Sequence, residues 1–147
     1  MTSETRRLVG RLRVALPAAD AFALFTPLGE REWAHGWDPQ FPCPIDDDTV
    51  PGTVFETDAH GRRTTWVVTS NEPPHGIAYA RVTPGDRAGT VSVALKPAND
   101  HTEVEVTYVL TSLASSAERD LQRFADGYVA YLQSWEHDIA ACLARRA

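Results

Sequence analysis

The sequence predicts an α+β fold in which a curved antiparallel sheet of about six strands packs against a long C-terminal helix. Three patterns predict it. The N-terminal segment alternates apolar and polar residues, the middle of the chain holds short strand-like runs between turns, and residues 115–147 carry one apolar stripe at helical spacing. Because a helix with one apolar stripe must bury it, we expect the inner face of the sheet to receive the helix.

The first strand is predicted over residues 6–16, where every second residue is apolar. Pro17 stops the strand and suits the first turn of a helix, so a short helix is expected over residues 18–26. Pro27 ends that helix, and a second short helix is expected over residues 29–34. A proline-rich loop follows.

Five more strands are predicted in the middle of the chain, separated by turns that are rich in Gly, Pro, Asn and Asp. Strands so closely spaced indicate an antiparallel meander. The predicted ranges are 53–57, 63–70, 77–83, 90–96 and 102–113.

Residues 115–147 are predicted to form a single helix of about 30 residues, roughly 45 Å long. Ser115 followed by Glu118 matches a capping box, and no proline interrupts the segment. A straight helix cannot follow a strongly curved sheet along its whole length, so a gap at one end is the expected pocket. The predicted apolar stripe consists of Leu121, Phe124, Tyr128, Leu132, Trp135, Ile139 and Cys142.

Length and composition restrict the possible classes of protein. The 147 residues fit one domain, residues 1–147, with 43% hydrophobic and 23% charged residues. A net charge of -6 argues against nucleic-acid binding, which needs a positive field. No apolar run has the roughly 20 residues of a membrane span, and the N-terminus lacks the apolar stretch of a signal peptide. We therefore expect a cytoplasmic protein, as a monomer or homodimer.

Two segments resemble a known superfamily. LPAADAFALF (residues 16–25) is similar to the passage from first strand to first helix in START/SRPBCC proteins, and GEREWAHGWDP (residues 29–39) resembles a run in bacterial members. With the closing amphipathic helix, the resemblance covers nearly the whole chain and implies the helix-grip fold. The superfamily includes birch-pollen-allergen-like proteins, polyketide aromatase/cyclases and activator-of-Hsp90-ATPase-like domains. Its members bind sterols, lipids, polyketides or hormones, and some are enzymes, so the fold alone selects no function.

Aromatic side chains are the main candidates for contact with a ligand, because large rings line many small-molecule pockets. The alternative is that they only fill the core. The candidates are Trp33, Trp37, Tyr79, Tyr108, Phe124, Tyr128 and Trp135.

Proton transfer would need an imidazole, carboxyl or phenol group inside the pocket. The candidates are His35 with Asp38, and Tyr128; the alternative for the first two is a solvated loop. Glu56 and Arg81 are charges within strands, and alternation leaves their facing open, although the exposed outer face is expected for each.

No metal or cofactor is expected. The histidines are scattered, the three consecutive aspartates 46–48 lack the glycine of a calcium loop, and no phosphate-binding glycine motif occurs. Cys43 and Cys142 are too isolated for a disulfide framework, so we expect two free thiols.

The leading functional hypothesis is therefore the binding of a small hydrophobic or aromatic molecule between the C-terminal helix and the sheet. A polyketide cyclase/dehydratase-like enzyme that uses acid–base residues in the same cavity is the alternative. A co-chaperone-like interaction domain is the second alternative. The sequence leaves open whether the protein is an enzyme.

Overall fold

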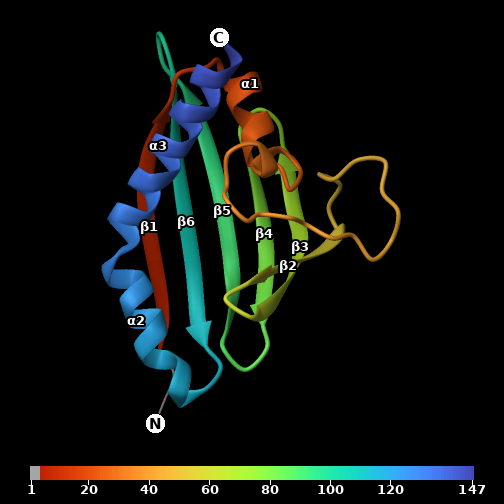
Figure 1. The fold of residues 1–147 in the computed structure, drawn as a ribbon, viewed down its shortest axis with the longest axis vertical. Coiled ribbons are helices and arrows are strands. Elements are labelled where there is room, and N and C mark those ends of the chain that lie inside the picture. The colour runs from red at the N-terminus through yellow and green to blue at the C-terminus, as the bar shows by residue number, and fades with distance from the viewer. Residues whose placement is uncertain (1–3) are drawn as a thin grey trace.

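The computed structural model describes residues 4–147 and contains one six-stranded antiparallel sheet with helices on one face (Figure 1). The strands are hydrogen-bonded in the order β1-β6-β5-β4-β3-β2, so β2 to β6 form a meander and β1 joins it beside β6. This arrangement confirms the predicted α+β helix-grip fold. The strands are β1 (Thr5–Val14), β2 (Val54–Ala59), β3 (Arg62–Glu72), β4 (Gly76–Thr83), β5 (Arg87–Pro97) and β6 (Thr102–Ser112).

The helical segments lie in two parts of the chain. Two short helical turns follow β1, as predicted, although the second ends at Glu32 rather than at residue 34. Within residues 4–147, none of the helices is both long and apolar enough to cross a membrane. The segments are α1 (Ala18–Phe22), η1 (Ala23–Phe25), η2 (Gly29–Glu32), η3 (Ser115–Ala117), α2 (Glu118–Asp126) and α3 (Tyr128–Arg146).

The prediction of a single unbroken C-terminal helix is wrong, because the helix breaks at Gly127. This residue has φ -95° and ψ 9°, away from α-helical values. Glycine is among the weakest helix formers, at a cost of about 1 kcal/mol relative to alanine, so the break falls where the helix is least stable. The predicted capping box is also wrong: Ser115 makes no capping bond, and the Glu118 carboxylate instead accepts hydrogen bonds from Ser112 and Arg6.

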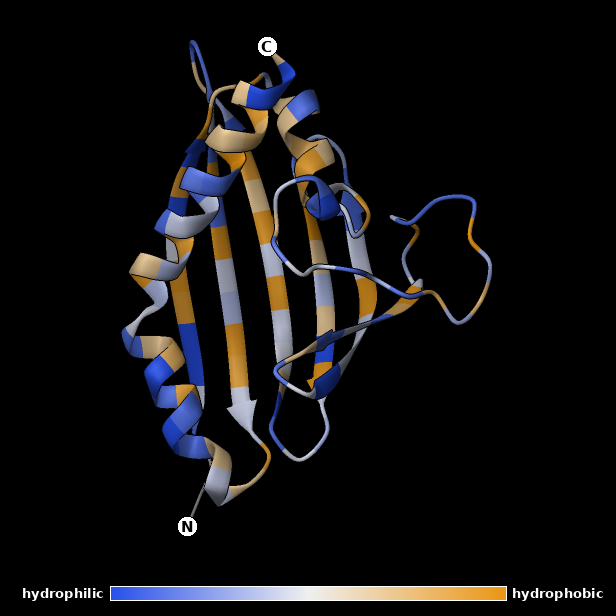
Figure 2. Cartoon of the chain, viewed as in Figure 1, coloured by the Kyte–Doolittle hydropathy of each residue, from blue (hydrophilic) through white to orange (hydrophobic). Residues whose placement is uncertain are grey.

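The inner face of the sheet and the apolar stripe of α2 and α3 form the core. Figure 2 shows hydrophobic and hydrophilic residues alternating along the strands, as a sheet with one buried face requires. On β6, Val104 and Val106 are fully buried while Glu103 and Glu105 face outward. The stripe residues Leu121, Tyr128, Leu132, Trp135, Ile139 and Cys142 are buried, as predicted, and Phe124 is half-buried.

Helix α3 lies along β1 at the edge of the sheet rather than across its middle (Figure 1). Gly10 in β1 permits this close approach, because a Cβ atom there would lie 2.3 Å from Cδ1 of Leu132. The uncovered part of the inner face therefore lies beside α3, over β3, β4 and β5, and not only at one end of the helix as the sequence suggested.

The substitution Gly10→Ala should lower the free energy of unfolding by about 1–3 kcal/mol, because the added methyl group overpacks the contact with Leu132. The same change should cost clearly less in a Leu132→Ala background, where space is available. Urea unfolding followed by circular dichroism measures both differences. An equal loss in the two backgrounds would contradict the assignment of the contact.

Candidate ligand-binding cavity

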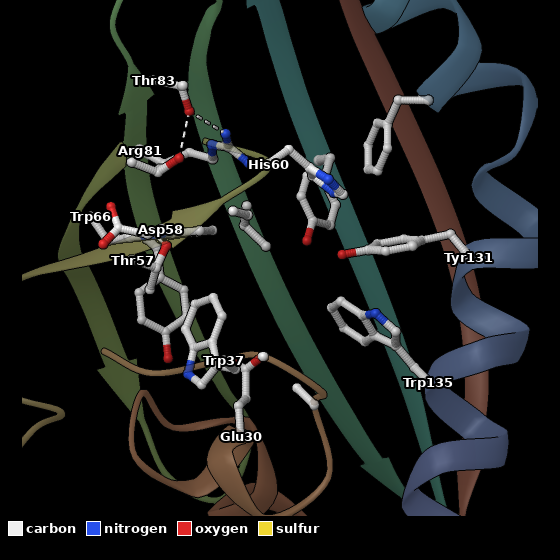
Figure 3. Close-up of a pocket in the computed structure, with 18 of the residues that line it drawn as sticks. Glu30, Trp37, Thr57, Asp58, His60, Trp66, Arg81, Thr83, Tyr131 and Trp135 are labelled. Atoms are coloured by element: carbon white, nitrogen blue, oxygen red, sulfur yellow. Dashed lines mark hydrogen bonds between the residues drawn. The ribbon is translucent and has the colours of Figure 1, made fainter. Parts of the chain in front are cut away.

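A cavity of about 950 Å³ lies between the inner face of the sheet, helix α3 and the segment from η2 to Trp37 (Figure 3). This volume is within the range of small-molecule sites, roughly 300–1,000 Å³. Exposed residues such as His60 and Arg123 border its mouth. Its deeper walls are largely aromatic.

Most of the predicted lining residues reach the cavity wall. They are Trp33, Trp37, Tyr79, Tyr108, Phe124 and Trp135. Tyr128, in contrast to the prediction, does not reach the cavity wall. It is buried elsewhere and donates a hydrogen bond of 2.6 Å to the Val106 carbonyl oxygen.

Sequence reasoning missed further aromatic lining residues, namely Phe25, Phe55, Trp66 and Tyr131. Tyr131 lies off the apolar stripe and is 37% exposed, but the exposed surface borders the cavity. Trp66 could have been found, because it shares a strand face with the buried Val68.

Contacts between aromatic rings join the two sides of the cavity. The rings of Trp33 and Trp135 meet edge to face with their centroids 5.3 Å apart, which links the segment after η2 to α3. Trp37 meets Trp66 of β3 in the same manner at 5.5 Å. Such pairs favour offset or perpendicular geometry, so they hold the walls in a defined position.

The polar atoms of several wall aromatics are already bonded within the protein. Each such group donates its hydrogen to a main-chain carbonyl, so this hydrogen is not available to a ligand, and the bond fixes the orientation of the ring. The bonds run from Tyr79 Oη to Phe25 O (2.8 Å), from Trp33 Nε1 to Leu24 O (2.7 Å) and from Trp37 Nε1 to Pro27 O (2.7 Å).

Arg81 points into the cavity, so the expectation of an outward position is wrong. It shares a face of β4 with Ile77 and Tyr79, both of which are buried. Its Nη2 donates to Thr83 Oγ1 at 2.8 Å, and its guanidinium lies 5.0 Å from the centroid of the Trp66 ring. Burial lowers the pKa of Arg81 from its ordinary value.

Glu56, in contrast, faces outward as expected. Its neighbours in β2, Phe55 and Thr57, are buried on the inner face. The Glu56 carboxylate pairs with Arg63 at 3.4 Å on the outer surface.

Glu30 supplies a carboxyl group to the opposite wall (Figure 3). Part of its side chain borders the cavity, but the surrounding protein excludes most water, and this burial raises the pKa of Glu30 well above its ordinary value. Tyr108 and Tyr131 lie within electrostatic reach of both Glu30 and Arg81. Burial, above all, raises the pKa of both phenols.

The predicted pair of His35 and Asp38 does not form. His35 is at the cavity mouth with 87% of its side chain exposed, and its Nε2 lies 3.9 Å from a carboxylate oxygen of Asp138. Asp38 lies outside the cavity wall, 3.8 Å from Arg31, with 66% of its side chain exposed. Neither residue is desolvated in the way that tuned acid–base groups are.

Within residues 4–147, no three His, Cys, Asp or Glu side chains gather in a way that could hold a metal ion. Cys43 is exposed and Cys142 is buried, and both are free thiols.

Substitution of Glu30 by Gln should change how stability depends on pH. Because the pKa of Glu30 is raised in the folded state, the unfolded chain loses this proton first as the pH rises. The free energy of unfolding of wild type therefore falls above the usual glutamate pKa of about 4.3, and the fall ends where Glu30 ionises in the folded state as well. An amide at this position cannot ionise and removes this fall, so the variant should gain stability relative to wild type at pH 8 compared with pH 4. Urea unfolding at both values measures the gain.

The exposed Glu32 belongs to the same turn, and Glu32→Gln is the matched control. A difference between Glu30→Gln and wild type that is equal at pH 4 and pH 8 would contradict the raised pKa.

Comparison with known proteins agrees with this geometry. A family model described as polyketide cyclase / dehydrase and lipid transport matches residues 5–134. A search of curated proteins finds no match.

Solved structures share the fold at low identity. A protein from Rhizobium leguminosarum is 20% identical with a TM-score of 0.69, over 98% of this chain and 97% of that one. CalU16 from Micromonospora echinospora is 18% identical with a TM-score of 0.61, over 97% and 90%. The Aha1 dimer from Colwellia psychrerythraea is 17% identical with a TM-score of 0.54, over 70% and 75%. The chain belongs to the polyketide cyclase / dehydrase and lipid transport family, within the START/SRPBCC superfamily that its sequence resembles.

Proposed function

We propose that the protein binds one small, largely aromatic molecule in the cavity between α3 and the sheet. The observation that carries this proposal is the cavity of about 950 Å³ whose aromatic walls have several of their own polar atoms bonded to the main chain. Walls of this kind offer ring faces and edges to a ligand and require few hydrogen bonds in return. The fold and the family description support a ligand-binding or cyclase-like role.

A cyclase- or dehydratase-type enzyme is the second candidate, and Glu30 is the observation that favours it. Burial raises the pKa of Glu30, so the carboxyl keeps its proton to a higher pH than an exposed glutamate does, and a protonated carboxyl can act as a general acid. Glu30 also lies within electrostatic reach of the phenols of Tyr108 and Tyr131. In this candidate Glu30 takes the place of His35, Asp38 and Tyr128 as the group that moves a proton.

The neutral fluorophore N-phenyl-1-naphthylamine should bind to the purified protein with saturation at one molecule per chain. All four tryptophans of the chain line the cavity, so excitation of tryptophan should produce emission from the bound probe by energy transfer. Val91→Phe fills the cavity floor between Tyr79 and Tyr108 and should weaken binding by about tenfold or more. Fluorescence titration measures the dissociation constants.

Ser92→Phe is the matched control, because it adds a similar side chain on the exposed outer face of the same strand. It should bind the probe as wild type does. Unsaturable binding, or equal affinities in Val91→Phe and wild type, would show that the probe does not enter the cavity.

A further inference from the structure

We infer that the ligand is an aromatic acid, and that its carboxylate or similar anionic oxygen group binds the guanidinium of Arg81. The inference rests on the proposed function and adds the chemical class of the ligand. Its basis is a half-buried cation, without an ion-pair partner in residues 4–147, on the wall of an otherwise mostly apolar cavity.

Arg81 retains hydrogen-bond donors that the protein does not use. Its Nε is buried and has no partner, and Nη2 donates to the Thr83 hydroxyl. A buried donor without a partner is costly, and the cost is larger for a charged group. Nε itself has almost no accessible surface, so a ligand oxygen would accept from the part of the guanidinium that borders the cavity and would offset the charge there.

The other charged side chains around the cavity already have partners. Each of the remaining lining arginines forms an ion pair, and so do the lining aspartates Asp58, Asp86 and Asp120. The pairs are Arg87 with Asp86 (2.9 Å), Arg62 with Asp86 (3.6 Å), Arg123 with Asp120 (3.4 Å) and Asp58 with Arg63 (3.0 Å). The remaining lining aspartate, Asp138, lies 3.9 Å from the exposed His35 at the cavity mouth. The carboxylates near Arg81 are therefore occupied elsewhere.

Glu30 does not neutralise Arg81 either. The two groups form no ion pair, and Figure 3 shows them on different walls, with Glu30 on η2 and Arg81 on β4. Burial favours the neutral form of Glu30, so its carboxyl adds little negative charge. The cavity thus offers one fixed positive charge to whatever enters it.

The surroundings of Arg81 hold the guanidinium ready for a planar oxygen group. The Thr83 hydroxyl, which accepts from Arg81, is itself bonded to Thr64 at 2.5 Å (Figure 3). The Trp66 ring lies beneath the cation, and its Nε1 donates to Thr57 at 3.0 Å. A guanidinium that is fixed in this way binds a carboxylate by two parallel hydrogen bonds at a small entropic cost.

The rest of the cavity determines the body of the ligand. Tyr131 projects from α3 toward the centre of the cavity, and Trp135 and Trp37 provide ring surfaces farther from Arg81 (Figure 3). A flat apolar ring system with a single acidic group matches this distribution. A polyphosphate does not, because within residues 4–147 the other lining arginines already form ion pairs with carboxylates.

The test is a competition between 2-naphthoate and 2-naphthamide for displacement of N-phenyl-1-naphthylamine. The two competitors share a ring system and differ by a carboxylate against a neutral amide. In wild type, naphthoate should displace the probe at a roughly 10- to 100-fold lower concentration, as expected for hydrogen bonds to a charged group. In Arg81→Gln this ratio should fall to about one.

Arg62→Gln is the matched control, because it removes the same charge from an exposed arginine at the cavity mouth and should retain the ratio. Arg81→Met, which retains packing against Trp66, is the second variant should Arg81→Gln fail to fold, and the same loss is expected. The inference is wrong if naphthoate and naphthamide displace the probe from wild type at about the same concentration, or if both Arg81 variants keep the wild-type preference for naphthoate. In either case the proposed function stands. Failure of the probe to bind wild type overturns the proposed function itself.

Discussion

The close approach of α3 to β1 at Gly10 determines where the other parts of this protein lie. A Cβ atom at residue 10 would overlap Cδ1 of Leu132, so the absence of a side chain at Gly10 favours the close packing of the helix along the sheet edge. With α3 at the edge, the inner face over β3, β4 and β5 needs another cover. The segment after η2 provides it from the opposite side, and the contact between Trp33 and Trp135 joins the two covers. The cavity is the space that remains between them.

The polar groups around this cavity fall into two sets with different consequences. The indole and phenol donors of Trp33, Trp37 and Tyr79 are bonded to the main chain, so these rings are fixed in orientation and their donors are already used. Arg81 and Glu30 have no ion-pair partner in residues 4–147, although burial disfavours their charged forms. Such groups reduce stability, and proteins retain them most often where a ligand or a reaction uses them.

The structural neighbours show the fold of this chain and not its site. At identities of 17% to 20%, the shared features are the alternating strands and the closing helix, which depend on hydrophobic pattern more than on particular residues. The ligand must therefore be inferred from side chains of this chain that project into its own cavity, and Arg81 is the most specific of them. The same scaffold accommodates different chemistry when those side chains change.

The sequence by itself determined the elements and most of their faces. Period-two alternation predicted the first strand, turn residues separated the other five, and helical periodicity placed Leu132 and Trp135 on the buried stripe. It also identified most of the aromatic wall, because large apolar residues on inward faces have few other places to lie. The break at Gly127 was within reach of helix propensities, but the apolar stripe alone gave no sign of it.

Only the tertiary structure decided which groups share the cavity. Arg81 shares a face of β4 with buried residues, but a charged side chain is expected on the outer face of a sheet. The cavity accommodates the Arg81 side chain on the inner face. Tyr131 and Glu30 border the same cavity because α3 lies at the sheet edge and η2 faces it from the other side. His35 lies beside Asp138 of α3, and not beside Asp38 as predicted, because its segment faces α3. Periodicity along a chain indicates which face a residue occupies, whereas a site depends on where separate elements meet. In this protein, the packing at Gly10 and between Trp33 and Trp135 brings the elements of the site together.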